Sequence, residues 1–346
     1  PIFFSRVLLG GDIGFGEAFM HGQWDSPDPV AVMRFFIRNR EVFADGRLQS
    51  NWFGRFLARA LEMGRRNTLW GSRRNIRRHY DLSNDFFGLF LDTSMSYSCA
   101  VYQSSDEDLE TAQQNKYDLL INKARLQASD HLLERGCGWG GFAEYAAKER
   151  GLKVTGLTIS KEQRDYAVAR MAREGLSDRV EIKLQDYRDE KGTYDGIASI
   201  EMFEAVGERY WPLYFEKLGK CLRPGGKAAL QIITIDGNAY HYYRRRTDFI
   251  QRYIFPGGML PPVERLEQLA QDAGLVIEES YLHGHDYART LKHWHRAFDA
   301  CRDEISALGF DEGFRRMWKY YLSYCETGFL LGRIDLLQLV LSGRAA

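Results

Sequence analysis

The most informative segment of the chain is Leu132-Leu133-Glu134-Arg135-Gly136-Cys137-Gly138-Trp139-Gly140-Gly141. Apolar residues lead into closely spaced glycines, which is the pattern of a β-strand whose carboxyl end turns tightly into a helix beside a ligand. Gly136, Gly138 and Gly141 also match the dinucleotide pattern Gly-x-Gly-x-x-Gly, which on its own is a weak signal. The segment therefore predicts a strand, a ligand-binding loop and a helix of a Rossmann-like sheet.

Two features near this loop distinguish S-adenosylmethionine from a nicotinamide cofactor. A nicotinamide site would carry an acidic residue about 20 positions further on to hold the ribose, but this chain has Gly156-Leu157-Thr158-Ile159-Ser160 there. Glu134 directly precedes the glycines, as in methyltransferases with the motif Glu-x-Gly-x-Gly-x-Gly. Asp186 is expected to end the third strand, where such enzymes bond the adenine amine. We therefore expect S-adenosylmethionine as co-substrate, and a nicotinamide oxidoreductase is disfavoured.

Short apolar segments alternate with helical ones from residue 130 onward. The predicted strands cover residues 131–135, 153–157, 180–184, 195–200 and 227–235. Helices are predicted at 141–148, 161–174 and 209–222, and Arg223-Pro224-Gly225-Gly226 is the expected turn into the fifth strand. After Pro261 we expect a helix and a strand, then two long helices at 287–307 and 312–331 and an antiparallel strand at 336–341. Alternation of this kind predicts an α/β fold with a mainly parallel sheet flanked by helices on both faces.

The first part of the chain has a different character. Residues 1–50 contain short apolar stretches, a glycine-rich piece and the turn-like Ser26-Pro27-Asp28-Pro29, which predict a small α+β accessory region. A helical pattern follows at 52–66, and residues 55–78 hold eight arginines and one acid. Such a helix could lie on an anionic membrane surface, or it could be an interdomain helix with solvated arginines. We place a domain boundary between an accessory region with its basic linker helix, 1–72, and a catalytic domain, 73–346.

Composition limits the class of protein. Lys+Arg and Asp+Glu both number 47, so net charge does not point to a nucleic-acid partner. Five cysteines without a Cys-x-x-Cys pair predict a reducing compartment and argue against a disulfide framework or a metal site. No apolar run approaches the roughly 20 residues that span a bilayer. The expected location is cytoplasmic, and peripheral at the inner membrane surface.

Several further motifs carry a resemblance to a known family. The chain resembles the cyclopropane fatty acid synthase family, including the mycolic acid cyclopropane enzymes, from about residue 74 to the end. The motifs that carry the resemblance, besides the glycine loop, are Arg74-Asn75-Ile76-Arg77-Arg78-His79-Tyr80-Asp81-Leu82-Ser83-Asn84, Met95-Ser96-Tyr97-Ser98-Cys99, the segment 156–160 with Gln163, Glu201-Met202-Phe203-Glu204-Ala205-Val206-Gly207 and Ile254-Phe255-Pro256-Gly257-Gly258. The resemblance implies a class I methyltransferase fold.

The resemblance also implies roles for individual residues. Beyond Glu134, the residues that it assigns to S-adenosylmethionine are Tyr97 and Ser98 at the methionine end, Gly136 and Gly138 along it, Thr158 and Gln163 near the ribose, and Asp186 and Tyr187 at the adenine. Family members hold a bicarbonate ion beside the reacting carbon, and its matching ligands here are the Cys99 backbone, Glu204, Gln231, the Ile233 backbone and Tyr287.

Two residues depart from the family pattern. Gln231 stands where a histidine is common, which weakens the expected anchoring of the ion, although glutamine can still donate a hydrogen bond. Arg135 stands where an apolar strand residue is usual. Because a buried unpaired guanidinium is costly, we expect Arg135 to reach solvent, to find an acid, or to weaken the protein.

The implied reaction is transfer of a one-carbon unit to the cis double bond of an unsaturated acyl chain of a membrane phospholipid. Methyl attack on the alkene creates a carbocation, which aromatic faces can stabilise, and bicarbonate would then remove a proton so that a cyclopropane ring closes. Loss of a proton from a neighbouring carbon would instead give a methylene branch, later reducible to a methyl branch, and capture of water would give a hydroxyl. A non-catalytic lipid-binding protein on the same fold is the alternative of another class. A second copy of the chain, in a homodimer, is a further expected partner.

Overall fold

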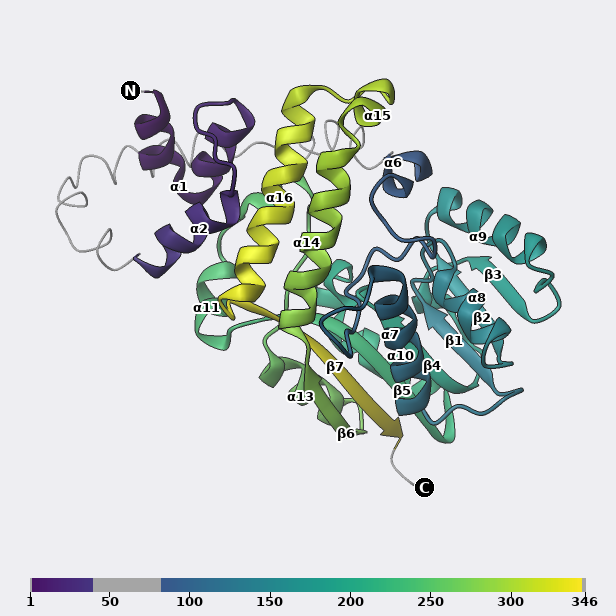
Figure 1. Ribbon diagram of the computed structural model, residues 1–346. Helices are drawn as coiled ribbons and strands as arrows, with labels where there is room; N and C mark the ends of the chain where they lie inside the picture. The colour runs from purple at the N-terminus through teal and green to yellow at the C-terminus, as the bar shows by residue number, and fades with distance from the viewer. Residues whose placement is uncertain (1, 40–81, 344–346) are drawn as a thin grey trace.

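The computed structural model describes residues 2–39 and 82–343 of the chain. These residues form a seven-stranded sheet with the strand order β3-β2-β1-β4-β5-β7-β6 (Figure 1). The strands are β1 (His131–Arg135), β2 (Lys153–Thr158), β3 (Val180–Leu184), β4 (Tyr194–Ile200), β5 (Leu222–Ile235), β6 (Leu275–Leu282) and β7 (Ile334–Gly343). Strands β1 to β5 pair in parallel, and β7 pairs antiparallel with β5 and β6. The predicted mainly parallel sheet with a final antiparallel strand is confirmed.

The expected turn before the fifth strand lies inside the strand. β5 already pairs with β4 at Leu222, opposite Tyr194, and the pairing then resumes at Lys227, opposite Gly196. Four residues of β5 therefore bulge out of the register, and Gly225 takes the left-handed φ of 80° that the bulge requires. The expected turn at Arg223-Pro224-Gly225-Gly226 is thus a bulge within β5, because strand pairing continues on both sides of it.

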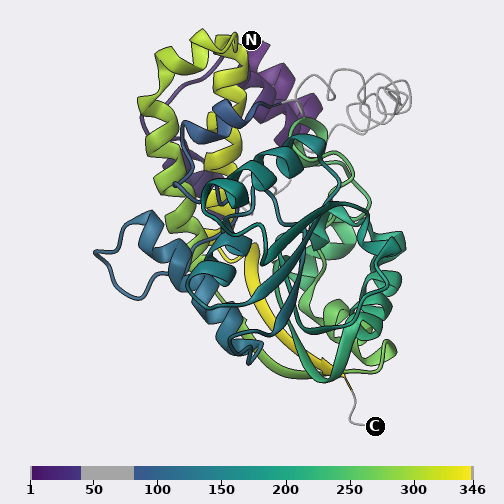
Figure 2. The same ribbon diagram turned by 90° about the vertical axis from the view of Figure 1, so that its right-hand side faces the viewer.

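Helices cover the sheet on both faces (Figure 2). One face packs against α7 (Leu109–Lys123), α8 (Gly141–Lys148) and α9 (Lys161–Arg173), and the other against α10 (Trp211–Cys221) and α13 (Val263–Asp272). Successive strand side chains point to opposite faces, so Leu132 belongs to the first core and Leu133 to the second. Both leucines are fully buried, which explains why the central strands are apolar along their whole length.

A third layer of helices stands over the carboxyl end of β5. It contains α14 (Gly284–Ala300) and α16 (Glu312–Leu330). Strand β7 begins shortly after α16, and its first residue, Ile334, pairs with Ile235, the last residue of β5. The predicted helix 287–307 is interrupted at Cys301, which leaves helical geometry at φ −98° and ψ 36° and separates α14 from α15 (Arg302–Ala307). The remaining short helices are α6 (Asn84–Gly88), α11 (Gly237–Tyr243) and α12 (Phe249–Tyr253), with 3-10 turns at Tyr187–Asp189, Phe203–Ala205 and Glu208–Tyr210.

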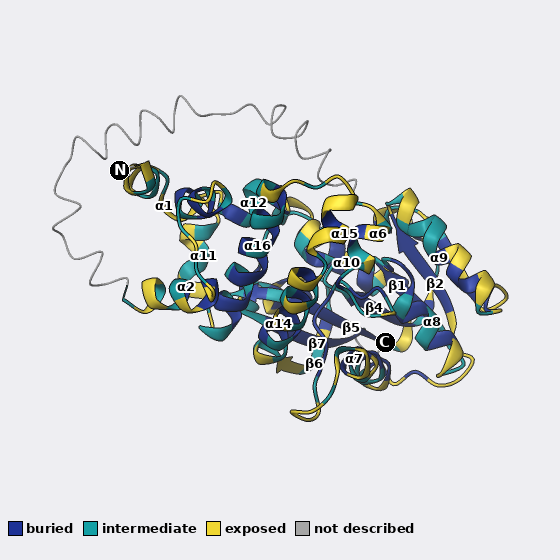
Figure 3. Ribbon diagram, turned by 45° about the horizontal axis from the view of Figure 1, so that its top comes forward, coloured by how far each residue is buried: buried dark blue, intermediate teal, exposed yellow. Residues whose placement is uncertain are grey.

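The described N-terminal residues are helical. Residues 2–39 form α1 (Ile2–Met20) and α2 (Pro29–Arg38), with no strand among them, so the β part of the expected α+β region is not found there. The glycine-rich piece lies inside α1, where Gly11 makes a kink at φ 56°. Gly16 allows close packing on the helical layer, because a Cβ there would lie 2.5 Å from the Phe249 ring and 2.8 Å from the Tyr320 ring. Both helices pack against α16 (Figure 3).

Some sequence predictions fall on residues that the structure does not describe. The helix at 52–66, the arginine-rich segment 55–78 and most of the motif 74–84 lie within residues 40–81. Among the described residues, no helix is long and apolar enough to cross a membrane, and no cluster of side chains there could hold a metal ion.

Arg135 finds neither solvent nor an acid. The side chain at the end of β1 is fully buried, and its guanidinium donates to the carbonyl oxygens of Tyr214 (3.3 Å) and Lys217 (2.7 Å) on α10. It also lies over the rings of Tyr187 and Tyr214, at 5.6 and 5.3 Å from their centroids. Carbonyl oxygens and aromatic faces thus replace the expected carboxylate partner.

Candidate active site

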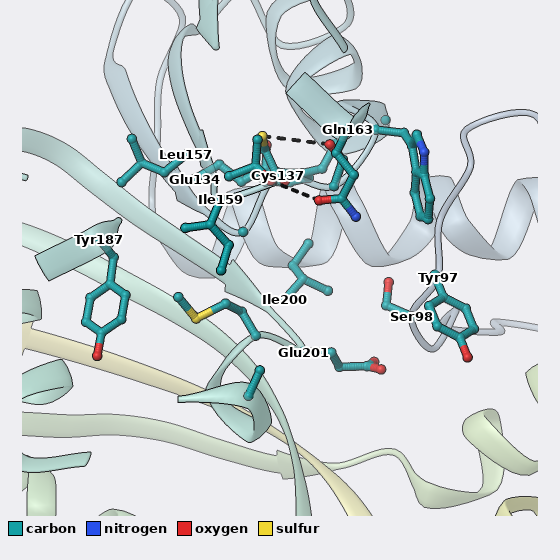
Figure 4. A pocket seen from close by; sticks show the side chains of 18 of the residues that line it. Tyr97, Ser98, Glu134, Cys137, Leu157, Ile159, Gln163, Tyr187, Ile200 and Glu201 are labelled. Carbon is teal, nitrogen blue, oxygen red and sulfur yellow. Dashed lines mark hydrogen bonds between the residues drawn. The ribbon is translucent and has the colours of Figure 1, made fainter. Parts of the chain in front are cut away.

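A cavity of about 470 Å³ opens at the carboxyl ends of β1, β2, β3 and β4 (Figure 4). This is where parallel α/β sheets bind their ligands, and the volume is typical of a small-molecule site. All nine residues that the sequence assigns to S-adenosylmethionine line it: Tyr97, Ser98, Glu134, Gly136, Gly138, Thr158, Gln163, Asp186 and Tyr187. The structure therefore brings these nine residues together from three strand ends, those of β1, β2 and β3, and from the loop before α7.

The glycine loop has backbone angles that other residues rarely adopt. Gly136, Gly138 and Gly140 have φ values of 80°, 51° and 82°, and the N–H groups of Gly136 and Cys137 both donate to the Leu157 carbonyl at 2.9 Å. A Cβ on Gly136 would lie 2.8 Å from Met202 Cγ, whereas a Cβ on Gly138 would meet no atom within 4 Å. Gly136 is thus required by packing within the protein, and Gly138 leaves open space for a ligand.

Glu134 supplies a buried carboxylate beside this loop. The residue is 3% exposed, and its Oε2 has no hydrogen-bond partner among the described residues. Burial raises the pKa of Glu134 to about 8, because the charged form is poorly solvated there. A buried carboxyl group with one oxygen that has no hydrogen-bond partner among the described residues fits a cationic ligand in the cavity. S-adenosylmethionine carries both an ammonium and a sulfonium group, so the residues present fit it.

The far end of the cavity holds the residues expected near the ribose and the adenine. Thr158 Oγ1 donates to Gln163 Oε1 at 2.9 Å at the start of α9. Asp186 pairs with Arg188, whose Nε and second guanidinium nitrogen donate to its two oxygens at 2.9 and 2.6 Å. These hydrogen bonds lower the pKa of Asp186, and an adenine amine would compete with Arg188 for the carboxylate. The Tyr187 ring lies at the opposite end from Tyr97 and Ser98 (Figure 4).

A lysine that sequence reasoning missed lies beside Ser98, at the end of the cavity where the methionine part is expected. Lys116 on α7 is fully buried, and its Nζ donates to Ser98 Oγ at 2.8 Å and to Gln113 Oε1. Gln113 in turn donates to the Ser98 carbonyl at 3.0 Å. Burial lowers the pKa of Lys116 to about 8. The spacing of Gln113 and Lys116, one helical turn apart, was the available signal, but it did not show that this face of α7 is buried.

The five residues expected to hold bicarbonate lie next to this end but do not line the cavity. Three of these residues donate a hydrogen bond to the same side chain, that of Glu201. The Cys99 N–H donates to Glu201 Oε1 at 2.8 Å, Gln231 Nε2 donates to the same oxygen at 2.9 Å, and the Tyr287 hydroxyl donates to Oε2. The other two expected ligands bond each other, since the Ile233 N–H donates to Glu204 Oε1.

Glu201 and Glu204 form a partly buried acidic pair. Glu204 Oε2 has no partner within the described residues, and burial together with the charge of Glu201 raises the pKa of Glu204 to about 8. Burial also raises the pKa of Glu201, but three hydrogen bonds and Lys116 oppose this shift. Glu201 is therefore the member of the pair that the surroundings stabilise as a carboxylate. Cys99 has a thiol pKa raised by burial, so it is no activated nucleophile.

Glu201 belongs to a motif that the sequence singled out, yet it received no role there. Its position directly after β4 was the available signal, because strand ends form the site in this fold. The bicarbonate ion that the family implies needs the Cys99 N–H, the Gln231 amide and the Tyr287 hydroxyl as donors. All three already donate to Glu201, so the residues as arranged do not fit a bound bicarbonate.

Comparisons with known proteins agree with this geometry. The model of the family described as mycolic acid cyclopropane synthetase matches residues 69–339. Tuberculostearic acid methyltransferase from Mycobacterium tuberculosis is 40% identical and covers 96% of this chain and 79% of its own length. Cyclopropane-fatty-acyl-phospholipid synthase from Escherichia coli K12 is 36% identical over 99% of this chain and 86% of its own length.

A solved structure gives the same result in three dimensions. The crystal structure of a mycolic acid cyclopropane synthase in complex with SAH and CTAB superimposes with a TM-score of 0.72 and 32% identity, over 78% of this chain and 97% of that one. The predicted class I methyltransferase fold is thereby confirmed. The chain is an S-adenosylmethionine-dependent methyltransferase, and it belongs to the mycolic acid cyclopropane synthetase family.

Proposed function

We propose that the enzyme transfers a one-carbon unit from S-adenosylmethionine to the cis double bond of an unsaturated acyl chain of a membrane phospholipid, and that a cyclopropane ring results. The observation that carries this proposal is the partly buried acidic pair Glu201 and Glu204 beside the Tyr97 end of the cavity, next to a layer of aromatic rings. An alkene is a poor nucleophile, so it must be held in line with the sulfonium methyl in a site without water. A carboxylate in such a site can then accept the proton that the product must lose.

The aromatic layer suits a cationic intermediate. The Tyr97 ring lies 5.3 Å from that of Trp294, and the Tyr287 ring stacks on Phe329 at 4.3 Å. Tyr97 lines the cavity and Tyr287 contacts Glu201, so these rings border the place where methyl transfer would occur. Ring faces attract a cation without acting as nucleophiles that would trap it.

The phospholipid substrate and a peripheral location at the cytoplasmic membrane surface rest on two observations. A 36% identical relative is named cyclopropane-fatty-acyl-phospholipid synthase, and the sequence carries eight arginines in residues 55–78. A basic segment of this kind is attracted to anionic lipid headgroups. The expected homodimer has no further support and stays a prediction.

The direct test is methyl transfer from methyl-labelled S-adenosylmethionine to phospholipid vesicles. We expect label in vesicles with cis-unsaturated acyl chains and none in vesicles with saturated chains of the same headgroup. Free unsaturated fatty acids, dispersed in detergent, serve as the second comparison. Label in the free acids but not in the phospholipid would contradict the proposed substrate.

A methylene- or methyl-branched product is the second candidate. It is favoured by the relative named tuberculostearic acid methyltransferase, which is 40% identical to this chain, and by Gln231 at a position where histidine is common in the family. A ring and a methylene branch add the same mass to the chain, so mass spectrometry alone does not separate them. Proton NMR of the purified product distinguishes ring methylene protons from those of an exocyclic double bond, and only the ring supports the first candidate.

A further inference from the structure

The Glu201 carboxylate accepts from three of the groups that the family resemblance assigns to bicarbonate. Its two oxygens accept from the Cys99 N–H at 2.8 Å, from the Gln231 amide at 2.9 Å and from the Tyr287 hydroxyl. The Gln231 amide is itself oriented, since its Nε2 also donates to the Cys99 carbonyl at 3.2 Å and its Oε1 accepts from Gln338 at 2.9 Å. A planar anion with two oxygens is therefore held at this point by the chain itself.

The backbone of Glu201 is bent to place the side chain there. Glu201 follows the last residue of β4 with a left-handed φ of 49°, a conformation that residues other than glycine rarely adopt. Its N–H donates to the Gln231 carbonyl at 2.8 Å. Strained backbone of this kind persists where the surrounding structure holds it, and it is concentrated at functional sites.

Glu201 is the member of the acidic pair that faces the cavity. Glu201 lines the cavity together with Ser96, Tyr97 and Ser98, and in Figure 4 its carboxyl group extends toward Tyr97 and Ser98. Glu204, by contrast, does not line the cavity and keeps one oxygen without a partner among the described residues. Of the two acids, Glu201 is the one that a substrate bound in the cavity can reach.

We propose that Glu201 is the proton acceptor of the reaction and takes the place that bicarbonate would occupy. The proposal rests on the proposed function. The S–CH₃ bond breaks with its electrons remaining on sulfur, and the π electrons of the alkene form the new bond to the methyl carbon. Glu201 then accepts a proton from that methyl group, and the C–H electrons close the ring onto the cationic carbon. If a hydride first shifts from the methyl-bearing carbon to the cationic carbon, loss of a methyl proton to Glu201 leaves an exocyclic double bond and gives the methylene-branched product. The carboxylic acid later loses its proton to water.

The first experiment uses the unchanged enzyme and so does not depend on a variant that folds. Methyl transfer to cis-unsaturated phospholipid vesicles is measured in degassed, bicarbonate-free buffer and again after bicarbonate is added. We expect the same rate in both. A rate that falls at least tenfold without bicarbonate and returns with it would overturn the proposal.

The second experiment compares substitutions of equal size. Glu201→Gln should slow turnover by roughly 10²–10⁴-fold, as expected for loss of a general base, whereas Glu204→Gln should lose less than tenfold because its amide oxygen can still accept from Ile233. Glu216→Gln, on the exposed face of α10, is the matched control and should match the unchanged enzyme. Thermal melting and S-adenosylmethionine binding verify that each variant is folded. Glu201→Gln with the rate of the control would refute the proposal.

Glu201→Gly provides a chemical rescue. Glycine suits the φ of 49° and empties the space between the three donors, so added bicarbonate or formate should restore activity at least tenfold over the unrescued variant. The proposed function fails separately: if the unchanged enzyme methylates no unsaturated phospholipid, the substrate is wrong. The role of Glu201 is then tested in the same way on the acyl substrate that does accept label.

Discussion

At the scale of single residues, Glu134 is expected to couple ligand binding to a proton. Its pKa of about 8 means that the carboxyl is mostly protonated at pH 7, and a cationic ligand favours the ionised form. Binding of S-adenosylmethionine at pH 7 should therefore release about one proton. Calorimetry in buffers of different ionisation enthalpy measures this number directly.

Glu134→Gln is the matched variant for this prediction. It should bind S-adenosylmethionine more weakly and release no proton, while its stability at pH 7 should not fall because the neutral amide replaces a neutral acid. A binding heat that is the same in every buffer for the unchanged enzyme would show that Glu134 does not face the cationic part of the ligand.

Tyr287 should act through Glu201. Its hydroxyl donates to the Glu201 carboxylate, so Tyr287→Phe removes a hydrogen bond to the charged form and raises the pKa of Glu201 further. A base works only when it is deprotonated, so the variant should need a higher pH for the same turnover number. The loss at pH 7 should be about 10- to 100-fold, since a hydrogen bond to a charged group contributes about 1.5–3 kcal/mol.

The pH profile of kcat distinguishes this effect from a packing defect. Tyr287→Phe should shift the acidic limb upward, although Glu204 and Lys116, both with pKa values of about 8, also titrate nearby. Tyr240→Phe removes a hydroxyl that bonds Glu208 at the molecular surface and serves as the control. An equal loss at all pH values would indicate that Tyr287 only packs against Phe329.

At the scale of elements, the glycine loop contains two glycines with different tasks. Gly138→Val should abolish S-adenosylmethionine binding, because its side chain would enter space where no protein atom lies within 4 Å of the Cβ position. Gly136→Ala should instead lower stability by about 1–3 kcal/mol, through backbone strain and contact with Met202. In the double variant Gly136→Ala with Met202→Ala, the part of this stability loss that comes from the contact with Met202 should be recovered. Unchanged calorimetric affinity in folded Gly138→Val would contradict the assignment of the loop.

The basic segment is the second element with a testable role. Replacement of Arg55, Arg59, Arg65 and Arg66 by Gln should weaken binding to anionic vesicles, since each charge near such a surface contributes about 1 kcal/mol. Binding of the unchanged protein should also fade as salt is added. If cosedimentation with vesicles responds neither to the Arg→Gln replacements nor to salt, the segment has a structural role only.

At the scale of the whole molecule, the N-terminal helices should contribute to a common core. Phe19 of α1 is 1% exposed and packs against Trp24 and Tyr320, and Arg316 of α16 donates to the Phe19 and Trp24 carbonyls at 2.6 and 2.9 Å. Phe19→Ala should therefore cost about 3–5 kcal/mol of unfolding free energy. Denaturant unfolding measures this loss.

Phe4→Ala is the control, because Phe4 in the same helix is 67% exposed. Equal stability of the two variants would show that α1 does not stabilise the fold. Limited proteolysis of Phe19→Ala adds a second result: cleavage confined to residues 2–39 would support the proposed domain boundary after residue 72, whereas cleavage throughout the chain would indicate one cooperative unit.

The sequence alone determined the sheet and the ligand-binding edge of this protein. Strands β1 to β5 and the glycine loop follow from patterns within short segments, and the family resemblance assigned nine of the residues that line the cavity. The carboxyl ends of parallel strands necessarily meet at one edge. Local patterns also located the Pro-Gly-Gly irregularity, although they did not show that it is a bulge within β5.

Only the tertiary structure decided which groups meet at the acidic pair. Cys99, Glu201, Gln231 and Tyr287 come from four separate segments, and no local pattern states that three of them donate to the fourth. The same holds for Lys116, whose Nζ donates to Ser98 on the loop before α7, and for Arg135, whose partners are carbonyl oxygens of α10 rather than an acid. Hydrogen bonds and desolvation act between atoms that are close in space, so the protonation states of these groups become defined only when the chain has folded.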